Sequence, residues 1–456
     1  MSDISPVTES LSAYIAGALA RPVPEAVVEK AKHHILDTMA SVVSGSRLKP
    51  GQMAIKYVRS QGGTREATLV GTRFLTSAVN AALANAMMAH ADETDDSHAA
   101  SKTHPGCSIV PAAWAMAERD RRSGEALLRA VVLGYDICCR ATKAVGIDVA
   151  PRSDRSTHST GGIWGAAAAA GALAGCDARM ARYLISYTAQ QTSGVSCWQR
   201  DEEHVEKAFD FAGMPARNAV AAATMVAAGF SGVADPLSGP HNYFLALART
   251  ADPEAFVDGL GSRYEIMGTN IKRWSVGSPI IAALDGLVAL IKEHDLRPDD
   301  VMRLTATIPE SGLRTVDNRH MPDVNIQHAL AVALLDRGFT FAAAHDYQRM
   351  SDPAVLEIRK RLTVIGDAAV RLSNKRGQAI VEVKTRDGRD LSIVIHAVRG
   401  TADNPMPRSE VEDKARDLLE PIVGRASTTK LIRRIWTLER VRDILDLRPF
   451  LQPPGR

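Results

Sequence analysis

Hydrophobic residues recur with helical periodicity through the first half of the chain. After Pro24, apolar residues follow one helical face as far as Gly45, a residue type that often ends helices. The same pattern returns in segments rich in alanine and other small residues, at 76–88, 110–117, 125–140, 165–174, 180–188 and 217–228. Small residues allow helix axes to approach closely. The pattern predicts an all-helical domain over residues 1–265.

The pattern changes after residue 265. Residues 278–292 predict a helix, and threonines alternate with apolar residues at 301–308 as on a half-buried strand. Residues 379–384 and 391–395 flank Asp387-Gly388, a turn pair that predicts a hairpin. A capping box at 409–412 predicts helices over 411–423 and 429–447. We therefore expect a mainly α protein, with an α+β domain at 266–400 and C-terminal helices at 401–456 that return to the helical domain.

Composition and charge favour a small-molecule partner. The 456 residues are 45% hydrophobic, enough for two domains. Lys and Arg (55) nearly balance Asp and Glu (52), without a long basic run, so neither nucleic acid nor a membrane surface is an expected partner. Five cysteines without a Cys-x-x-Cys pair predict neither a disulfide framework nor a metal cluster. The N-terminus lacks a signal-peptide pattern and the apolar run at 161–175 is too short for a bilayer, so we expect a cytoplasmic protein.

Residues 90–105 form a polar cluster at the C-terminal end of a predicted core helix. Three histidines, four carboxylates and one lysine occupy these sixteen residues. We expect repulsion among Asp92, Asp95 and Asp96 to raise at least one carboxyl pKa, and we expect His98 and His104 to exchange protons near neutral pH. The alternative to acid–base chemistry is that these residues are solvated charges that cap the C-terminus of the helix. A metal site is a third possibility, although no His-Glu-x-x-His or EF-hand spacing is present.

Three further segments carry candidate chemistry, each with a structural alternative. His158 precedes an alanine-rich helix whose free N–H groups can hold a carboxylate, although ordinary capping explains the same residues. Lys207 precedes a small-residue helix and can bind an anion, or it belongs to a solvated charged loop. Lys272 and Arg273 precede the helix that starts at Ser278, near the expected domain junction, where two cations can clamp a carboxylate.

These motifs resemble the MmgE/PrpD family along nearly the whole chain, because they occur in the family's order and spacing. The family includes 2-methylcitrate dehydratase, cis-aconitate decarboxylase and iminodisuccinate epimerase. The resemblance implies a helical domain with a smaller α+β lid, a homodimer, no metal or organic cofactor, a di- or tricarboxylate substrate and an active site between the domains. The segments that carry it are 90–98, 103–105, the His158 loop with 165–168, Lys207, 228–232 and Lys272.

The resemblance also assigns site residues. It implies that the catalytic residues are Asp92, His104, His158 and Lys207. The expected substrate-binding residues are Asp95, Asp96, His98, Lys102, Thr103, Lys272, Arg273 and Ser278.

Two departures from the family pattern bear on these assignments. Two residues rather than one separate Asp92 from Asp95, so either can stand at the family's first catalytic aspartate position. The family's Lys-Pro-Tyr-Pro is replaced by Lys-Arg-Trp-Ser from Lys272 on, which weakens the case for a tricarboxylate.

From the family we expect a dehydratase, in which His104 or Asp92 moves a proton at carbon and His158 acts on the leaving hydroxyl or the opposite face. Lys207, Lys272 and Arg273 would hold the substrate carboxylates. Epimerisation and decarboxylation are alternatives that need the same stabilised carbanion. A carboxylate-binding scaffold protein without activity is the alternative outside enzymes.

Overall fold

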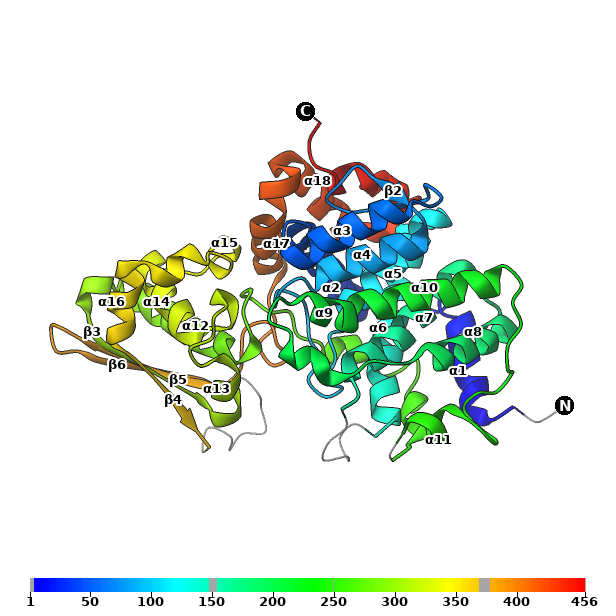
Figure 1. Ribbon diagram of the computed structural model, residues 1–456, viewed down its shortest axis with the longest axis horizontal. Helices are drawn as coiled ribbons and strands as arrows, with labels where there is room; N and C mark the ends of the chain where they lie inside the picture. The colour runs from blue at the N-terminus through cyan, green and yellow to red at the C-terminus, as the bar shows by residue number, and fades with distance from the viewer. Residues whose placement is uncertain (1–3, 147–153, 249, 369–377, 456) are drawn as a thin grey trace. The chain divides into compact units, whose positions relative to one another are not determined.

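The computed structural model describes residues 4–146, 154–248, 250–368 and 378–455. The chain forms two compact units. Unit 1 consists of Met1–Ala91, Asp95–Thr269 and Val411–Arg456, and unit 2 consists of Asp92–Thr94 and Asn270–Glu410. Helices make up most of the described chain and a four-stranded sheet lies in unit 2 (Figure 1). The predicted fold class, mainly α with a smaller α+β part, is confirmed.

Unit 1 is built from helices. Its α-helices are α1 (Pro6–Ala16), α2 (Glu25–Gly45), α3 (Lys49–Gln61), α4 (Ala78–Ala89), α5 (Pro105–Arg119), α6 (Gly124–Ala144), α7 (Thr157–Ala174), α8 (Ala178–Gln191), α9 (Val205–Ala208), α10 (Met214–Ala227), α11 (Tyr243–Leu247), α17 (Arg408–Val423), which starts in unit 2, and α18 (Arg425–Trp436). A small antiparallel sheet pairs β1 (Ala67–Thr68) with β2 (Leu75–Thr76). The short elements are the π-helical turn η2 (Phe209–Gly213) and the 3-10 helices η1 (Ser196–Arg200), η3 (Pro253–Phe256), η4 (Glu265–Gly268), η9 (Leu438–Arg440) and η10 (Ile444–Leu451).

Helices α6 and α7 approach each other at two glycines in unit 1. A β-carbon added at Gly165 would lie 2.4 Å from the Gly134 carbonyl oxygen, and one added at Gly134 would lie 3.0 Å from the Gly165 carbonyl oxygen. A side chain at Gly165 would therefore force the helices apart. This close contact fixes α7, whose first turn carries His158.

Unit 2 is a four-stranded sheet with helices packed against it. The strand order is β4 (Leu362–Asp367), β3 (Val301–Pro309), β5 (Ala379–Thr385) and β6 (Asp390–Ile395). Strands β3 and β4 are parallel and the other neighbours are antiparallel. The unit's α-helices are α12 (Ser278–His294), α13 (Glu310–Val316), α14 (Ile326–Asp336), α15 (Phe341–Ala344) and α16 (Pro353–Lys360). Its 3-10 helices are η5 (Pro298–Asp300), η6 (Pro322–Val324) and η7 (Gln348–Ser351).

Burial alternates along β5, as expected for a strand with one face toward the helices (Figure 1). The predicted hairpin is confirmed as β5 and β6, and Gly388 in its turn has φ of 91°. Such a positive φ favours glycine.

Two details of the C-terminal prediction are wrong. Helix α17 begins at Arg408, so the serine at 409 lies inside the helix and not at its cap. Helix α18 runs from Arg425 to Trp436 rather than from 429 to 447, and the chain continues in the 3-10 helices η9 and η10. Among the residues that the structure describes, none of the helices combines the length and the apolar character that a membrane span requires.

Candidate active site

Asp95 is the centre of a group of histidines in unit 1. His90 Nδ1 lies 2.9 Å from one carboxylate oxygen, and His104 Nδ1 lies 3.1 Å from both oxygens. His90 caps the C-terminus of α4 and His104 precedes the first residue of α5, so two helix ends bring both rings to the same carboxylate. A carboxylate only accepts hydrogen bonds. Each neutral ring therefore carries its proton on Nδ1 and keeps Nε2 as the basic nitrogen.

Phe211 stacks on two of the histidines. Its ring centroid lies 3.6 Å from that of His158 and 4.3 Å from that of His90, and both pairs are tilted by only 11°. Phe211 belongs to η2, and π-helical turns often occur at functional sites. The preceding residue, Asp210, accepts a hydrogen bond from the hydroxyl of Ser156, the N-cap of α7. The turn therefore fixes Phe211 relative to the helix that carries His158.

Burial and neighbouring charges set the protonation of this group. Burial lowers the pKa of His90, and burial together with the nearby His104 and His90 imidazoles lowers the pKa of His158 well below its usual range. Burial opposes ionisation of Asp95, but His90 and His104 hold the pKa of its carboxyl well below its usual range. At neutral pH Asp95 is thus a carboxylate beside neutral rings of His90 and His158. Within the described ranges, His90 Nε2 and His158 Nδ1 have no hydrogen-bond partner.

The Lys207 amine lies over aromatic rings. Its Nζ is 5.2 Å from the ring centroid of Phe211 and 5.7 Å from that of Trp198. Trp198 in turn meets His158 edge-on, with centroids 5.7 Å apart. Cation–π attraction favours the ammonium at such a position. Phe211 also stacks on the imidazoles of His90 and His158. The Lys207 amine and His158 therefore contact the same aromatic ring.

Asp92 and Glu93 are buried in unit 2, with 5% and 8% of their surfaces exposed. Lys272 Nζ lies 3.1 Å from Glu93 Oε2 and donates to the Glu93 carbonyl oxygen at 3.0 Å. Asp92 Oδ2 lies 3.0 Å from His345 Nε2. The Asp92 carboxylate also accepts hydrogen bonds from the Thr94 backbone N–H at 3.0 Å and hydroxyl at 2.6 Å. The two neighbouring acids therefore have different cationic partners.

Asp96, a predicted binding residue, lies in the interior of unit 1. It is wholly buried, and its Oδ1 accepts a hydrogen bond from the Gly106 backbone N–H at 2.9 Å. Its Oδ2 lies 2.7 Å from His34 Nδ1 and accepts a hydrogen bond from the Tyr135 hydroxyl at 2.6 Å. These contacts connect the start of α5 to α2 and α6.

Three other predicted residues form a tight turn before α5. His98 and Thr103 pair through their backbones, and Lys102, exposed with φ of 52°, lies in the turn between them. His98 Nδ1 lies 2.7 Å from the Ser101 hydroxyl oxygen, and that oxygen is 2.6 Å from the Thr103 hydroxyl oxygen. The side chains of His98 and Thr103 are thus directed to a neighbour within the turn.

The remaining predicted residues lie in unit 2. The Arg273 guanidinium is 4.5 Å from the ring centroid of Trp274 and 3.6 Å from an oxygen of Asp285. Ser278 is the exposed first residue of α12. Of the three predicted carboxylate-binding cations, the two in unit 2 contact protein carboxylates: Lys272 contacts Glu93 and Arg273 contacts Asp285.

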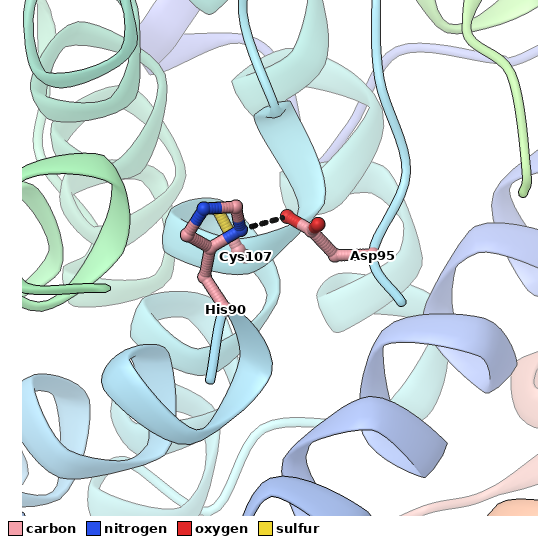
Figure 2. A group of neighbouring side chains, drawn as sticks. All are labelled: His90, Asp95 and Cys107. Carbon is pink, nitrogen blue, oxygen red and sulfur yellow. Dashed lines mark hydrogen bonds and ion pairs between the residues drawn. The ribbon is translucent and has the colours of Figure 1, made fainter. Parts of the chain in front are cut away.

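Two buried groups have side chains of metal-ligand type. The first contains His90, Asp95 and Cys107, whose ligand atoms lie within 4.8 Å of one another (Figure 2). Burial and the nearby Asp95 and Asp96 carboxylates raise the pKa of Cys107 well above its usual range. The sulfur is therefore a thiol, which is a poor metal ligand compared with a thiolate.

The second group contains His98, Cys139 and Glu265, again with ligand atoms within 4.8 Å. Lys143 Nζ lies 2.7 Å from Glu265 Oε2, so an ammonium already neutralises this carboxylate. In this second group the ammonium would compete with a metal ion for the carboxylate, and the expectation of a metal-free protein stays a prediction.

Four residues of these groups were not selected from the sequence: His90, Glu93, Phe211 and His345. His90 and Glu93 lie in the polar run, and their partners depend on tertiary contacts. The sequence signal that could have identified Phe211 is its position shortly after Lys207. Nothing in the sequence connects His345 with Asp92.

Comparison with known proteins covers both units. The MmgE/PrpD N-terminal domain matches residues 9–255 and the MmgE/PrpD C-terminal domain matches residues 274–438. The chain is 22% identical to the cis-aconitate decarboxylase-like protein oryM of Aspergillus oryzae, over 97% of this chain and 96% of that protein. It is 21% identical to a cis-aconitate decarboxylase of Aspergillus terreus (99% and 96% covered) and 22% identical to that of Homo sapiens (98% and 95% covered). As its motifs predicted, the chain belongs to the MmgE/PrpD family of lyase-type enzymes.

Proposed function

We propose that this protein is a cofactor-independent lyase that dehydrates a small hydroxy di- or tricarboxylate by proton transfer next to a carboxylate. The observation that carries the proposal is the Asp95 carboxylate shared by His90 and His104, with His158 stacked on the same phenylalanine as His90. A carboxylate behind an imidazole fixes its tautomer and orientation and stabilises the imidazolium that forms when the ring accepts a proton.

The contacts favour His104 over Asp92 as the group that moves the proton at carbon. His104 holds its Nδ1 toward Asp95, which leaves Nε2 as the base. Asp92 is instead paired with His345 and accepts two hydrogen bonds from Thr94. Its carboxylate is therefore already neutralised and less basic than a free one.

His158 is proposed to act on the leaving hydroxyl. In the absence of substrate, burial and neighbouring imidazoles keep this ring neutral. A bound di- or tricarboxylate brings negative charge, which raises the proton affinity of nearby imidazoles. Substrate binding would thus prepare His158 to donate a proton to the departing oxygen.

The cationic side chains are proposed to bind the substrate carboxylates. Lys207 lies beside the aromatic ring on which His158 stacks. Lys272 and Arg273 are adjacent in unit 2 and each lies near one protein carboxylate. Charge-assisted hydrogen bonds from such groups bind a carboxylate and stabilise an enolate-like intermediate.

Decarboxylation is the second candidate, because proteins named cis-aconitate decarboxylase match this chain over nearly its full length. Loss of carbon dioxide would leave the same type of carbanion, and protonated His104 could return a proton to it. Epimerisation would use two proton-transfer groups on opposite faces. The three reactions therefore differ in what leaves the substrate and not in how its charge is stabilised.

A substrate screen followed by NMR in deuterated water separates these reactions. Hydroxy, amino and unsaturated di- and tricarboxylates are incubated with the purified protein. Dehydration gives an alkene and water, decarboxylation releases carbon dioxide and places deuterium on the carbanion that remains, and epimerisation incorporates deuterium without loss of a group. Binding without any turnover would overturn the proposal and favour a carboxylate-binding scaffold.

The His104→Asn variant tests the assigned proton transfer. General acid–base groups typically contribute about 10²–10⁴-fold, so kcat should fall by this order with little change in KM. His241→Asn is the matched control, because His241 is exposed and asparagine tolerates its φ of 57°. Near-full kcat in folded His104→Asn would place the chemistry elsewhere, with His158 and Lys207 as the next candidates.

A further inference from the structure

His345 makes a contact in unit 2 that the proposed reaction does not use. It follows α15, and its Nε2 lies 3.0 Å from Asp92 Oδ2. Its Nδ1 lies 2.8 Å from the Phe341 carbonyl oxygen. The Phe341 carbonyl oxygen only accepts, so Nδ1 carries a proton, and the Asp92 carboxylate beside Nε2 favours a second proton there, which makes the side chain an imidazolium paired with Asp92.

The charges around His345 agree with this geometry. Burial lowers its pKa, but the carboxylates of Asp92 and Asp323 and the Phe341 carbonyl oxygen raise the pKa of His345 to about 9. Burial likewise raises the pKa of Asp92, but His345 and Thr94 outweigh it and lower that pKa. At neutral pH the two side chains therefore form an ion pair with only 18% and 6% of their surfaces exposed.

Hydrogen bonds between Asp92 and Thr94 fix the backbone at Glu93, the residue between them. Thr94 donates two hydrogen bonds back to the Asp92 carboxylate, which closes a turn around Glu93. Lys272 Nζ meets this turn twice, at the Glu93 carbonyl oxygen and at the Glu93 carboxylate. The Lys272 amine is thus positioned by the turn at Glu93. His345 contacts the same turn at Asp92.

We propose that His345 is a positioning residue, whose imidazolium anchors Asp92 and thereby holds Glu93 against the amine of Lys272. The functional consequence rests on the proposed function, in which Lys272 binds a substrate carboxylate. The anchor itself does not depend on that function, so the two can be tested separately.

The anchor has a defined dependence on pH. The folded-state pKa of His345 lies above the ordinary histidine value of 6.5. Its stabilising contribution is therefore complete below about pH 6.5 and is lost as the pH rises through about 9. We expect the turn to loosen and the Lys272 amine to lose its alignment in this alkaline range.

NMR titration of the full chain tests the ion pair without any substrate. In the unaltered protein the Cε1–H resonance of His345 should titrate with a midpoint near 9, and Asp92→Asn should move that midpoint down toward 6.5. Assignment comes from the loss of the resonance in His345→Gln. A midpoint near 6.5 in the unaltered protein, or one that Asp92→Asn leaves unchanged, would overturn the proposal.

Lysine acylation tests the positioning. Lys272 is 3% exposed, and Lys414, paired with buried Asp37 in unit 1, is the internal control because its side chain is 7% exposed. In His345→Gln, the rate of Lys272 acylation by sulfosuccinimidyl acetate, normalised to Lys414, should rise roughly tenfold to hundredfold, the factor that one charge-assisted contact carries. The matched control His396→Gln, at an exposed histidine of unit 2, should leave it unchanged. Equal protection of Lys272 in both variants would overturn the proposal.

Enzyme kinetics connect the anchor with the proposed function. If a substrate is turned over, His345→Gln should raise KM more than it lowers kcat, and it should remove the alkaline change in KM near pH 9 that the unaltered enzyme shows. An unchanged KM in His345→Gln, with a raised KM in Lys272→Met, would overturn the positioning role. If no carboxylate is turned over, the proposed function fails. The titration and acylation results still test whether His345 anchors Asp92 and holds Glu93 against Lys272.

Discussion

Replacement of Asp95 by asparagine should separate the chemical role of the histidine group from its role in stability. Asparagine has nearly the shape of aspartate, so the wholly buried position stays filled. It keeps one acceptor oxygen and exchanges the other for an amide that only donates. His104 Nδ1 lies 3.1 Å from both oxygens and would face the –NH₂ group as well as the remaining oxygen, whereas His90 Nδ1 would meet only the group at the Oδ2 position.

The two effects differ in size. A hydrogen bond to a charged group contributes about 1.5–3 kcal/mol, so the loss of one such bond should lower the free energy of unfolding by about that amount. Where the –NH₂ group donates to His104 Nδ1, the ring proton must move from Nδ1 to Nε2, which removes the basic nitrogen. A wrong tautomer of this kind lowers kcat by on the order of 10²–10⁴-fold.

The effect on stability has a defined sign with pH. The pKa of Asp95 in the folded protein lies well below its usual range. Its contribution is therefore complete above about pH 4, the value of an unfolded aspartate, and is lost only as the pH falls further. The difference between the two proteins should stay constant from about pH 5 to 8 and shrink in acid.

Urea unfolding followed by circular dichroism, together with kcat for a substrate from the screen, measures both effects. Asp136→Asn is the matched control. Asp136 is also wholly buried and accepts a hydrogen bond from the Tyr14 hydroxyl at 2.8 Å, but burial raises its pKa to about 7, so an amide resembles its protonated form. Folded Asp95→Asn protein with unchanged kcat would refute the idea that Asp95 sets the proton position on His104.

Three further outcomes are expected. Lys272→Met should raise KM by roughly tenfold to hundredfold with a smaller change in kcat, and a purely kcat effect would argue against carboxylate binding there. Extended EDTA treatment should leave turnover intact, whereas a loss that one divalent ion restores would make the polar run a metal site. Light scattering at micromolar concentration should give about twice the chain mass, because the family resemblance implies a homodimer, and a stable active monomer would contradict this.

Most of the fold could be predicted from the sequence where the hydrophobic pattern is long or where turn residues are specific. The hairpin of β5 and β6 is an example, since Asp387-Gly388 has the conformational freedom that its turn requires. The pattern failed after Trp436, where apolar residues continue in 3-10 helices with a similar spacing. Periodicity cannot distinguish these states, because both place residues three or four apart on one face.

The sequence indicated which segments form the candidate site, but not which side chains pair with one another within it. Residues 90–105 were identified from their density of charge, and the His158 and Lys207 segments from the chemistry of helix starts. Which acid meets which cation depends on contacts between distant segments, as for Asp92 with His345. The π-helical turn that places Phe211 also has no reliable sequence signature, because it differs from an α-helix by one inserted residue.

The four carboxylates of the polar run show why such a segment can be buried at all. Burying an unpaired carboxylate costs several kcal/mol, and four together would prevent folding. Each one has its own partners: His345 and Thr94 for Asp92, Lys272 for Glu93, His90 and His104 for Asp95, and His34, Tyr135 and Gly106 for Asp96. Of these partners, those of Asp95 include basic nitrogens that no described residue occupies, such as His90 Nε2. His34 Nε2, on the ring beside Asp96, also has no hydrogen-bond partner among the described residues. The rings around Asp95 in addition lie against His158 and share Phe211 with the Lys207 amine, so proton exchange with a substrate is best suited to them.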